Sequence, residues 1–335
     1  MKICVFGGGN IAHSLAAKLS DSQPVSVILL PEERWSNHLS YEQGGVLRPA
    51  RYDVFATSDA SIAGGMDIVF IALPQFAFRS ALDRLNPYLR EGQTVVMLPA
   101  PARMSEYAEE LIKRGVKVVA LQRVPYISRI LSYGVSVRIS DDRLEHKIVV
   151  SNANMKNEWT QLIPRWFGGK VSFLSSFMVF AFNNSNPLLH PSRLVVLFRD
   201  WRNHTFLTNP PFYAEWTDES SEVYITADAE MRTVMEQCQV INLERDYESV
   251  MTHYAVGSAR ELTEKIRSIP SFKSILSPMV ELNVEWVPDF SSRYFTEDVV
   301  YGTKTIQQFA RKYNVRTPRI DYLISAVADI RGSDK

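Results

Sequence analysis

The feature that most constrains the fold is an alternation of short apolar runs with helical patterns over roughly the first 150 residues. The runs at residues 2–6, 25–30, 53–57, 67–73, 94–98 and 117–121 are nearly continuous in apolar character. Such runs are typical of parallel strands that are buried under helices on both faces. The pattern predicts a doubly wound, Rossmann-type α/β domain, with residues 134–139 and 147–151 as further strands near the far edge of its sheet.

The second half of the chain has a different character. Long helix-compatible stretches occupy residues 227–240, 244–255 and 258–268, and turns that contain proline separate them. A chain of 335 residues is long enough to form two domains. We therefore predict a Rossmann-type domain over residues 1–165 and a mainly α-helical domain over residues 166–335.

Composition excludes several classes of function. The 37 basic residues balance 37 acidic ones, so no overall positive field attracts nucleic acid or an anionic membrane surface. Cys4 and Cys238 are the two cysteines, and they show no metal-ligand spacing. The most apolar later stretch, residues 171–182, is too short to cross a bilayer. We expect a cytoplasmic protein without a metal site, a nucleic-acid partner or a membrane span.

A glycine motif, GGGNIA at residues 7–12, directly follows the first apolar run and opens a helical pattern. In that context the first glycine allows a tight turn, the third lets the backbone approach a pyrophosphate, and the small alanine allows close helix packing. A plain turn between a strand and a helix is the alternative. Ligands also gather at the carboxyl ends of parallel strands. We expect cofactor contacts from Gly7, Gly9, Asn10, Ile11, Ala12, Leu73 and Pro74.

The residues after the second run leave the choice between NAD and NADP open. An NAD site usually has an acidic residue at the end of this strand, which binds the ribose 2′-hydroxyl group. Leu30 and Pro31 occupy that place here, and Glu32 and Glu33 follow them. Arg34 is a candidate partner for the 2′-phosphate of NADP. A solvated helix start is an equally good interpretation of these charges.

Two segments of the second half concentrate reactive side chains. The segment NPLLHP places His190 between an extended, proline-containing turn and an apolar helical run. Histidine titrates near neutral pH and can transfer a proton, although a histidine satisfied by the backbone is the simpler interpretation. The segment at residues 293–302, RYFTEDVVYG, combines charged and aromatic groups. Arg293 and Glu297 fit an exposed helical pair, with Asp298 as a neighbouring solvated charge.

The chain resembles the octopine/nopaline (opine) dehydrogenase family over nearly its whole length. The shared motifs are GGGNIA, DIVFIALPQFAFRSAL, RVPYISR, SNPLLHP, FYAEW and RYFTEDVVYG. The resemblance implies a Rossmann domain followed by a helical domain similar to the C-terminal domain of 6-phosphogluconate dehydrogenase. It also implies an NAD(P)-dependent oxidoreductase that acts on CH–NH donors, condensing an amino acid with an α-keto acid or catalysing the reverse oxidation.

The resemblance assigns roles in the second half. The family's NPxxHP histidine transfers a proton with help from the aspartate of RYxTEDV, and these roles fall on His190 and Asp298. The arginine of that segment holds a substrate carboxylate, which implies the same for Arg293. Asn186 belongs to the same group of substrate-binding residues, as does Arg129 at the end of RVPYISR.

Two positions depart from the family pattern. Val300 stands where the family often has proline, and Phe198 stands where it often has asparagine, which leaves the amine partner open. Two other functions compete with the opine reading. A 2-keto acid reductase similar to ketopantoate reductase would use a lysine, for which Lys170 and Lys304 are available. A catalytically silent dinucleotide sensor would lack the proton-transfer residues. The oligomeric state, including a homodimer, is also left open.

Overall fold

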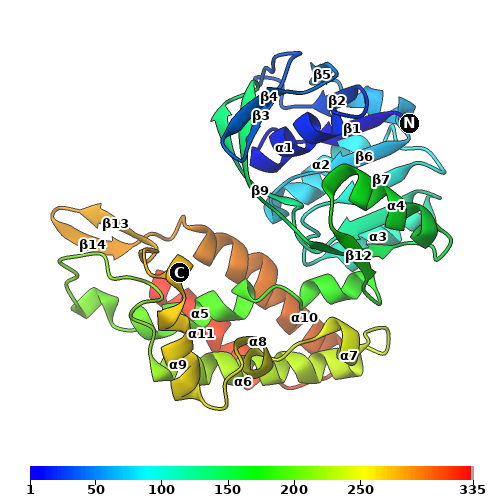
Figure 1. The fold of residues 1–335 in the computed structure, drawn as a ribbon. Coiled ribbons are helices and arrows are strands. Elements are labelled where there is room, and N and C mark those ends of the chain that lie inside the picture. The colour runs from blue at the N-terminus through cyan, green and yellow to red at the C-terminus, as the bar shows by residue number, and fades with distance from the viewer. Residues whose placement is uncertain (333–335) are drawn as a thin grey trace. The chain divides into compact units, whose positions relative to one another are not determined.

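The computed structural model describes residues 1–332. The chain divides into two compact units, Met1–Phe180 and Ala181–Lys335 (Figure 1). The division lies beyond the expected boundary at residue 165. Strand β12 (Lys170–Phe173) pairs with β11 (Glu145–Val150), and this pairing keeps the segment after residue 165 in the first unit.

The first unit is built on an eight-stranded sheet with the order β12-β11-β8-β7-β6-β1-β2-β5. Strands β1 and β6 are neighbours, and the strand order runs in opposite directions on either side of them. The doubly wound parallel sheet is confirmed, although β11 pairs with β8 in antiparallel fashion. The remaining bounds are β1 (Ile3–Phe6), β2 (Val25–Ile28), β5 (Val54–Thr57), β6 (Ile68–Ile71), β7 (Thr94–Met97) and β8 (Lys117–Leu121).

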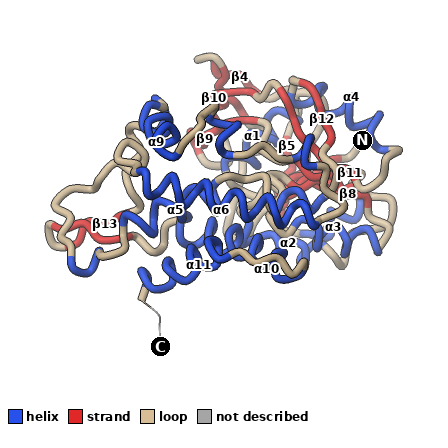
Figure 2. Tube along the Cα trace, turned by 90° about the horizontal axis from the view of Figure 1, so that it is seen from below, coloured by secondary structure: helices blue, strands red, loops and turns tan. Residues whose placement is uncertain are grey.

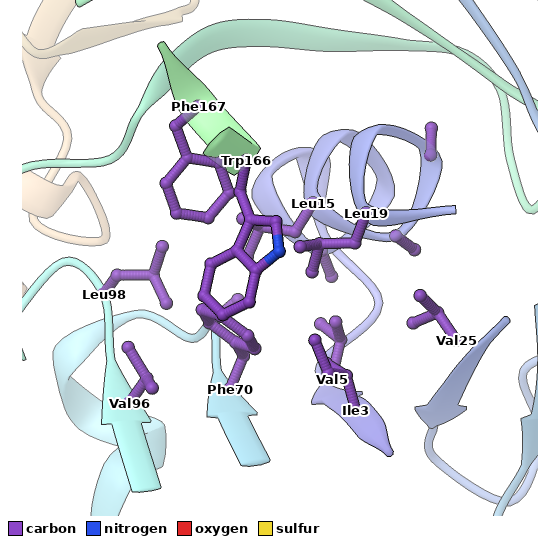
Figure 3. Packing of buried hydrophobic residues seen from close by; sticks show 14 of the residues in the cluster. Ile3, Val5, Leu15, Leu19, Val25, Phe70, Val96, Leu98, Trp166 and Phe167 are labelled. Atoms are coloured by element: carbon purple, nitrogen blue, oxygen red, sulfur yellow. The ribbon is translucent and has the colours of Figure 1, made fainter. Parts of the chain in front are cut away.

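Helices α1 (Asn10–Leu19) and α4 (Met155–Phe167) supply side chains to the core over one face of this sheet. Figure 3 shows Trp166 and Phe167 of α4 above Phe70 of β6, beside Leu15 of α1. Burial of a large apolar side chain contributes about 1.5–3 kcal/mol, so this cluster fixes α1 firmly on the sheet. Helices α2 (Phe78–Leu85) and α3 (Met104–Lys113) complete the larger helices of the unit.

A second sheet corrects one expectation from the sequence. Residues 134–139 do not extend the main sheet, because β10 (Ser136–Asp142) belongs to a four-stranded sheet with the order β4-β3-β10-β9. Val137 and Ile139 are buried and Arg138 is exposed, which is the alternation of a sheet with one solvated face. The other strands are β3 (Ser40–Gln43), β4 (Val46–Pro49) and β9 (Tyr126–Ser132). Of the residues 147–151, all but the last lie in the main sheet, as part of β11.

The second unit is mainly helical, as expected, and Figure 2 shows α5, α6 and α11 among its helices. Its helices are α5 (Asn186–Leu197), α6 (Asp218–Gln237), α7 (Leu243–Asp246), α8 (Val250–Tyr254), α9 (Ala259–Ser268), α10 (Lys304–Lys312) and α11 (Pro318–Arg331). A π-helix, η6, spans Tyr294–Thr303, and β13 (Met279–Leu282) pairs with β14 (Glu285–Pro288). Short 3₁₀ turns lie at Ala60–Gly65, Gln75–Ala77, Phe177–Ala181, Trp201–Asn203 and Pro270–Phe272.

The single helix expected at residues 244–255 is wrong, since α7 and α8 replace it. The side chains of Asn242 and Ser249 each accept a hydrogen bond at a helix start. Asp228 of α6 fastens the break, because its carboxylate accepts hydrogen bonds from the Tyr247 hydroxyl and the Val250 backbone N–H. These polar contacts compete with a continuous helix.

Candidate active site

The glycine loop between β1 and α1 has the geometry of a dinucleotide cradle. Gly7 has φ +139°, and a Cβ there would lie 2.6 Å from the carbonyl oxygen of Ala72 at the end of β6. Gly9 faces open space, with nothing within 4 Å of an added Cβ. Ala12 is fully buried. A tight first turn and an unobstructed third glycine at a helix start fit a bound pyrophosphate.

The other residues expected at this site surround the loop or brace it. A Cβ on Gly7 would lie 3.4 Å from the Leu73 side chain, and Pro74 is exposed. Ile11 packs against the core cluster. The side-chain oxygen of Asn10 accepts a hydrogen bond from the Ile130 backbone N–H at 2.8 Å, so this side chain ties α1 to the second sheet.

Glu33 reaches back from the end of β2 to the glycine loop. Its carboxylate accepts hydrogen bonds from the Leu30 backbone N–H at 3.0 Å and from the Tyr133 hydroxyl. A Cβ on Gly8 would lie 2.6 Å and 2.7 Å from the two carboxylate oxygens. Arg34 is exposed, and its guanidinium binds the carbonyl oxygens of Pro31 and Glu33. Glu33 therefore lies against the glycine loop, whereas the Arg34 side chain donates hydrogen bonds to carbonyl groups of its own turn.

His13 braces the glycine loop from inside the unit. Its Nδ1 donates to the Gly9 carbonyl oxygen at 2.9 Å, and its Nε2 accepts from the Gly134 backbone N–H at 2.8 Å. This arrangement requires a neutral imidazole, and burial lowers the pKa of His13 below its usual value. Both ring nitrogens of His13 thus form hydrogen bonds with backbone groups, and the residue has a structural role in the loop.

His190 lies inside helix α5, which corrects the expected extended turn. Pro187 occupies the first turn of α5, where the missing N–H costs little and the fixed φ favours the helix. Pro191 follows in the same helix. Pro187 thus helps to start the helix that buries His190, whose exposed fraction is 3%.

His190 and Asp298 form a buried pair in the helical unit. The imidazole Nδ1 donates to a carboxylate oxygen of Asp298 at 2.7 Å, and Asp298 is also 3% exposed. The Nε2 atom lies 2.8 Å from the Tyr213 hydroxyl. The Tyr294 ring stacks on the imidazole with 4.0 Å between ring centroids. A carboxylate at Nδ1 fixes the tautomer and stabilises an imidazolium, so this arrangement is suited to proton transfer at Nε2.

The π-helix η6 brings Asp298 to His190. A Cβ on Gly302 would lie 2.4 Å from Cγ of Pro187, so η6 meets the start of α5 at this glycine. The Thr303 hydroxyl donates to the Pro187 carbonyl oxygen at 2.5 Å. Wide π-helical turns are frequent at functional sites. The alternative of Asp298 as a solvated charge is wrong.

The other predicted substrate residues are more open. Arg293 precedes η6 and is exposed, and Asn186 opens α5 and is half-buried. Arg129 lies in the first unit on β9, is exposed, and donates to the Ser128 carbonyl oxygen. Phe198 is fully buried and packs with Phe295, so this departure from the family belongs to the core of the helical unit. Of the predicted site residues in the helical unit, the structure joins His190 and Asp298 by a hydrogen bond.

Two residues of the helical unit escaped the sequence reasoning. Tyr213 belongs to the FYAEW motif, which was noted without a role. Arg193 lies one turn after His190 on α5 and is only 3% exposed. Its Nε has no hydrogen-bond partner among residues 1–332, and burial lowers the pKa of Arg193 to about 10. A basic residue in a helix usually indicates a solvated face, so no sequence signal marks this burial.

Two other kinds of site are absent from the described residues. Within the part of the chain that the structure describes, no cluster of three or more histidine, cysteine or carboxylate side chains has the arrangement of a metal site. Over the same residues, no helix combines the length and the apolar character that a membrane span requires.

Comparison with known proteins identifies relatives for both units. Residues 173–331 match the family described as NAD/NADP octopine/nopaline dehydrogenase, alpha-helical domain, and residues 2–101 match the NADP oxidoreductase, coenzyme F420-dependent family. Octopine dehydrogenase from Mizuhopecten yessoensis is 22% identical, over 97% of this chain and 88% of its own. Tauropine dehydrogenase from Arabella iricolor is 24% identical, over 99% and 92%.

A solved structure of octopine dehydrogenase with NADH and L-arginine has a TM-score of 0.85 to this chain. It is 22% identical and covers 99% of this chain and 90% of its own length, which shows a shared fold. The two-domain fold and the family matches define the class of this protein as an NAD(P)-dependent oxidoreductase. Within that class, residues 173–331 match the octopine/nopaline (opine) dehydrogenase family, which is the family that the motifs suggested, and full-length relatives include octopine dehydrogenases.

Proposed function

We propose that this protein catalyses the NAD(P)H-dependent reductive condensation of an amino acid with an α-keto acid, or the reverse oxidation. The observation that carries the proposal is the buried contact between His190 and Asp298, at 2.7 Å. The two side chains come from separate motifs that both resemble opine dehydrogenases, and both lie in the unit that matches the helical domain of that family. CH–NH chemistry requires acid–base help at the condensing carbon, and this pair can provide it.

The chain's own residues divide the work between binding and proton transfer. Gly7 and Gly9 let the pyrophosphate lie on the helix start of α1. A nicotinamide cofactor, when bound, would supply the hydride for this reduction. His190 holds the proton that lets water leave when the imine forms, and Asp298 keeps the imidazole in one tautomer and stabilises its cation.

Both substrates carry carboxylates, and two arginines of the helical unit are candidates to bind them. Arg293 is exposed and accessible to a substrate, and the family resemblance implies that it binds a substrate carboxylate. Arg193 is buried, and its Nε–H donates to no acceptor among the described residues, so a substrate carboxylate would accept that hydrogen bond. Asn186, at the start of α5, and Arg129 keep the substrate-binding roles that the resemblance implies.

The position of Glu33 favours NADH over NADPH as the cofactor. Its carboxylate borders Gly8, where it can accept a hydrogen bond from a ribose 2′-hydroxyl group and would repel a 2′-phosphate. Arg34 lies next to it but donates to carbonyl oxygens of its own turn. An NADPH preference through Arg34 would require that side chain to leave these two acceptors.

The test is a screen of amino acid and keto acid pairs that follows nicotinamide absorbance with NADH and with NADPH. L-arginine, agmatine and pyruvate enter it first, because octopine dehydrogenase structures hold them. We expect oxidation of the nicotinamide only when an amine and a keto acid are both present. Oxidation with a keto acid alone would instead support the keto acid reductase. Saturable NADH binding without turnover on any pair would support the silent sensor.

A further inference from the structure

We propose that Tyr213 is a further catalytic residue, whose hydroxyl group passes the proton of His190 to the substrate oxygen. The inference rests on the proposed function, because it concerns the step in which water leaves. It adds a third member to the His190–Asp298 pair, and it gives a role to the FYAEW motif.

The contact at Nε2 is the first argument. His190 has two ring nitrogens, and Asp298 occupies Nδ1 while the Tyr213 hydroxyl lies 2.8 Å from Nε2. No ring nitrogen is therefore left to face a substrate directly. A hydroxyl group has one donor and two acceptor sites, so it can bind Nε2 and a substrate oxygen at the same time.

The packing around Tyr213 fixes its hydroxyl group in place. The residue is 4% exposed, and its ring stacks on Phe272 with 4.2 Å between centroids and 21° between planes. Trp216 lies nearly parallel on it, at 14°. Because aromatic neighbours hold the ring, its hydroxyl group stays at Nε2 and little entropy is lost when a substrate binds. A fixed hydroxyl group of this kind is suited to passing a proton from His190 to the substrate.

The charges around the hydroxyl group keep it neutral between turnovers. Burial raises the pKa of Tyr213, and the nearby Tyr294, Tyr254 and Asp298 raise it further. Burial also raises the pKa of Tyr294, while its hydrogen bond with the Tyr213 hydroxyl group and the positive charge of Arg293 lower it. Tyr213 thus remains an O–H donor at neutral pH. If His190 donates a proton to the Tyr213 oxygen while Tyr213 gives its own proton to the substrate, the unfavourable phenolate does not form.

The substrate intermediate is a carbinolamine, with a hydroxyl group and the amine nitrogen on the former keto carbon. Its C–O bond breaks as the oxygen takes the Tyr213 proton and leaves as water, and the nitrogen lone pair forms the C=N bond of the iminium ion. Tyr213 simultaneously takes the Nε2 proton of the His190 imidazolium, which becomes neutral imidazole beside Asp298.

The test compares Tyr213→Phe with His190→Ala and with the control Tyr322→Phe on one active substrate pair. Tyr322 is a half-buried tyrosine of the same unit, on α11, and its substitution should leave turnover unchanged. Tyr213→Phe keeps the aromatic stacking and removes only the hydroxyl group. We expect it to lower turnover by about 10²–10⁴-fold, with unchanged NADH affinity and melting temperature.

A second variant separates proton transfer from positioning. A fluorinated tyrosine at position 213 keeps the hydrogen bond but makes the phenol more acidic, so the limbs of the pH profile of turnover should move. A fixed profile together with activity lost only in Tyr213→Phe would reduce Tyr213 to a positioning residue and overturn the proposal. Near wild-type turnover of Tyr213→Phe, with His190→Ala inactive, would also overturn it. Full activity of His190→Ala would instead contradict the proposed function's mechanism.

Discussion

The contact between Gly302 and Pro187 sets the position of Asp298, and Gly302→Ala tests that claim. The new Cβ would lie 2.4 Å from Cγ and 2.6 Å from Cβ of Pro187, about 1 Å inside the 3.4 Å at which ordinary contact begins. The proline ring cannot rotate away, since it is rigid and lies in the first turn of α5. Helix α5 and η6 must therefore separate by about 1 Å.

The separation acts on stability and on the site together. The hydrogen bond from Thr303 to the Pro187 carbonyl oxygen and the 2.7 Å contact of His190 with Asp298 both join α5 to η6. Overpacking of a filled core costs about 1–3 kcal/mol of unfolding free energy. A misplacement of about 1 Å at reacting groups can cost about 10²-fold in rate. We expect both losses in Gly302→Ala.

Urea unfolding and steady-state turnover measure these two effects. Gly257→Ala is the matched control in the same unit, because its new Cβ would lie 3.6 Å from the side chain of Glu261, which is an ordinary van der Waals contact. The control should keep the stability and turnover of the wild type. Gly302→Ala with wild-type stability and wild-type turnover would refute the reasoning.

Three further predictions concern the first unit. Gly9→Val should keep the melting temperature, because Gly9 faces open space, but abolish NADH and NADPH binding in calorimetry; retained affinity would remove Gly9 from the site. Glu33→Ala should lower the ratio of NADH to NADPH affinity about tenfold, or ~1.4 kcal/mol, and an unchanged ratio would exclude Glu33 as the ribose contact. The pKa of His13 is lowered in the fold, so the unfolded chain binds more protons and stability falls as the pH drops below about 6.5. The variant His13→Gln can still donate to Gly9 and accept from Gly134, and it should reduce the loss of stability between pH 7.5 and pH 5.5 in urea unfolding. Part of the loss should remain, because burial also lowers the pKa of His146. The same loss of stability in wild type and variant would show that other groups cause it.

Most of the main sheet could be predicted because its central strands, such as β1, β6 and β7, are fully buried and consist of continuous apolar runs. The second sheet could not be placed in this way. Strand β4 is exposed along its whole length, and β3 is largely polar, so neither carries a strong apolar signal. The prediction of one helix at residues 244–255 was wrong for another reason. Asp228, on the preceding helix α6, accepts hydrogen bonds from Tyr247 and Val250 and so stabilises the break between α7 and α8.

The candidate site shows a similar division. The NPLLHP and RYFTEDVVYG segments were identified by resemblance, whereas their contact joins residues 108 positions apart and depends on the π-helical turns of η6. Tyr213 belongs to the FYAEW motif, but nothing in its sequence neighbourhood indicates that its hydroxyl group contacts Nε2 of His190. Long-range packing, which single-sequence patterns do not encode, supplies both contacts.

The central claim is that His190 and Asp298 act as one proton-transfer unit. A double-mutant cycle of turnover with His190→Ala, Asp298→Asn and the double variant tests it most directly, on an active substrate pair with NADH binding measured in parallel. Our account predicts that His190→Ala loses about 10²–10⁴-fold in turnover, and that adding Asp298→Asn costs little more, with NADH affinity intact. Losses that multiply in the double variant, or near wild-type turnover in His190→Ala, would contradict it.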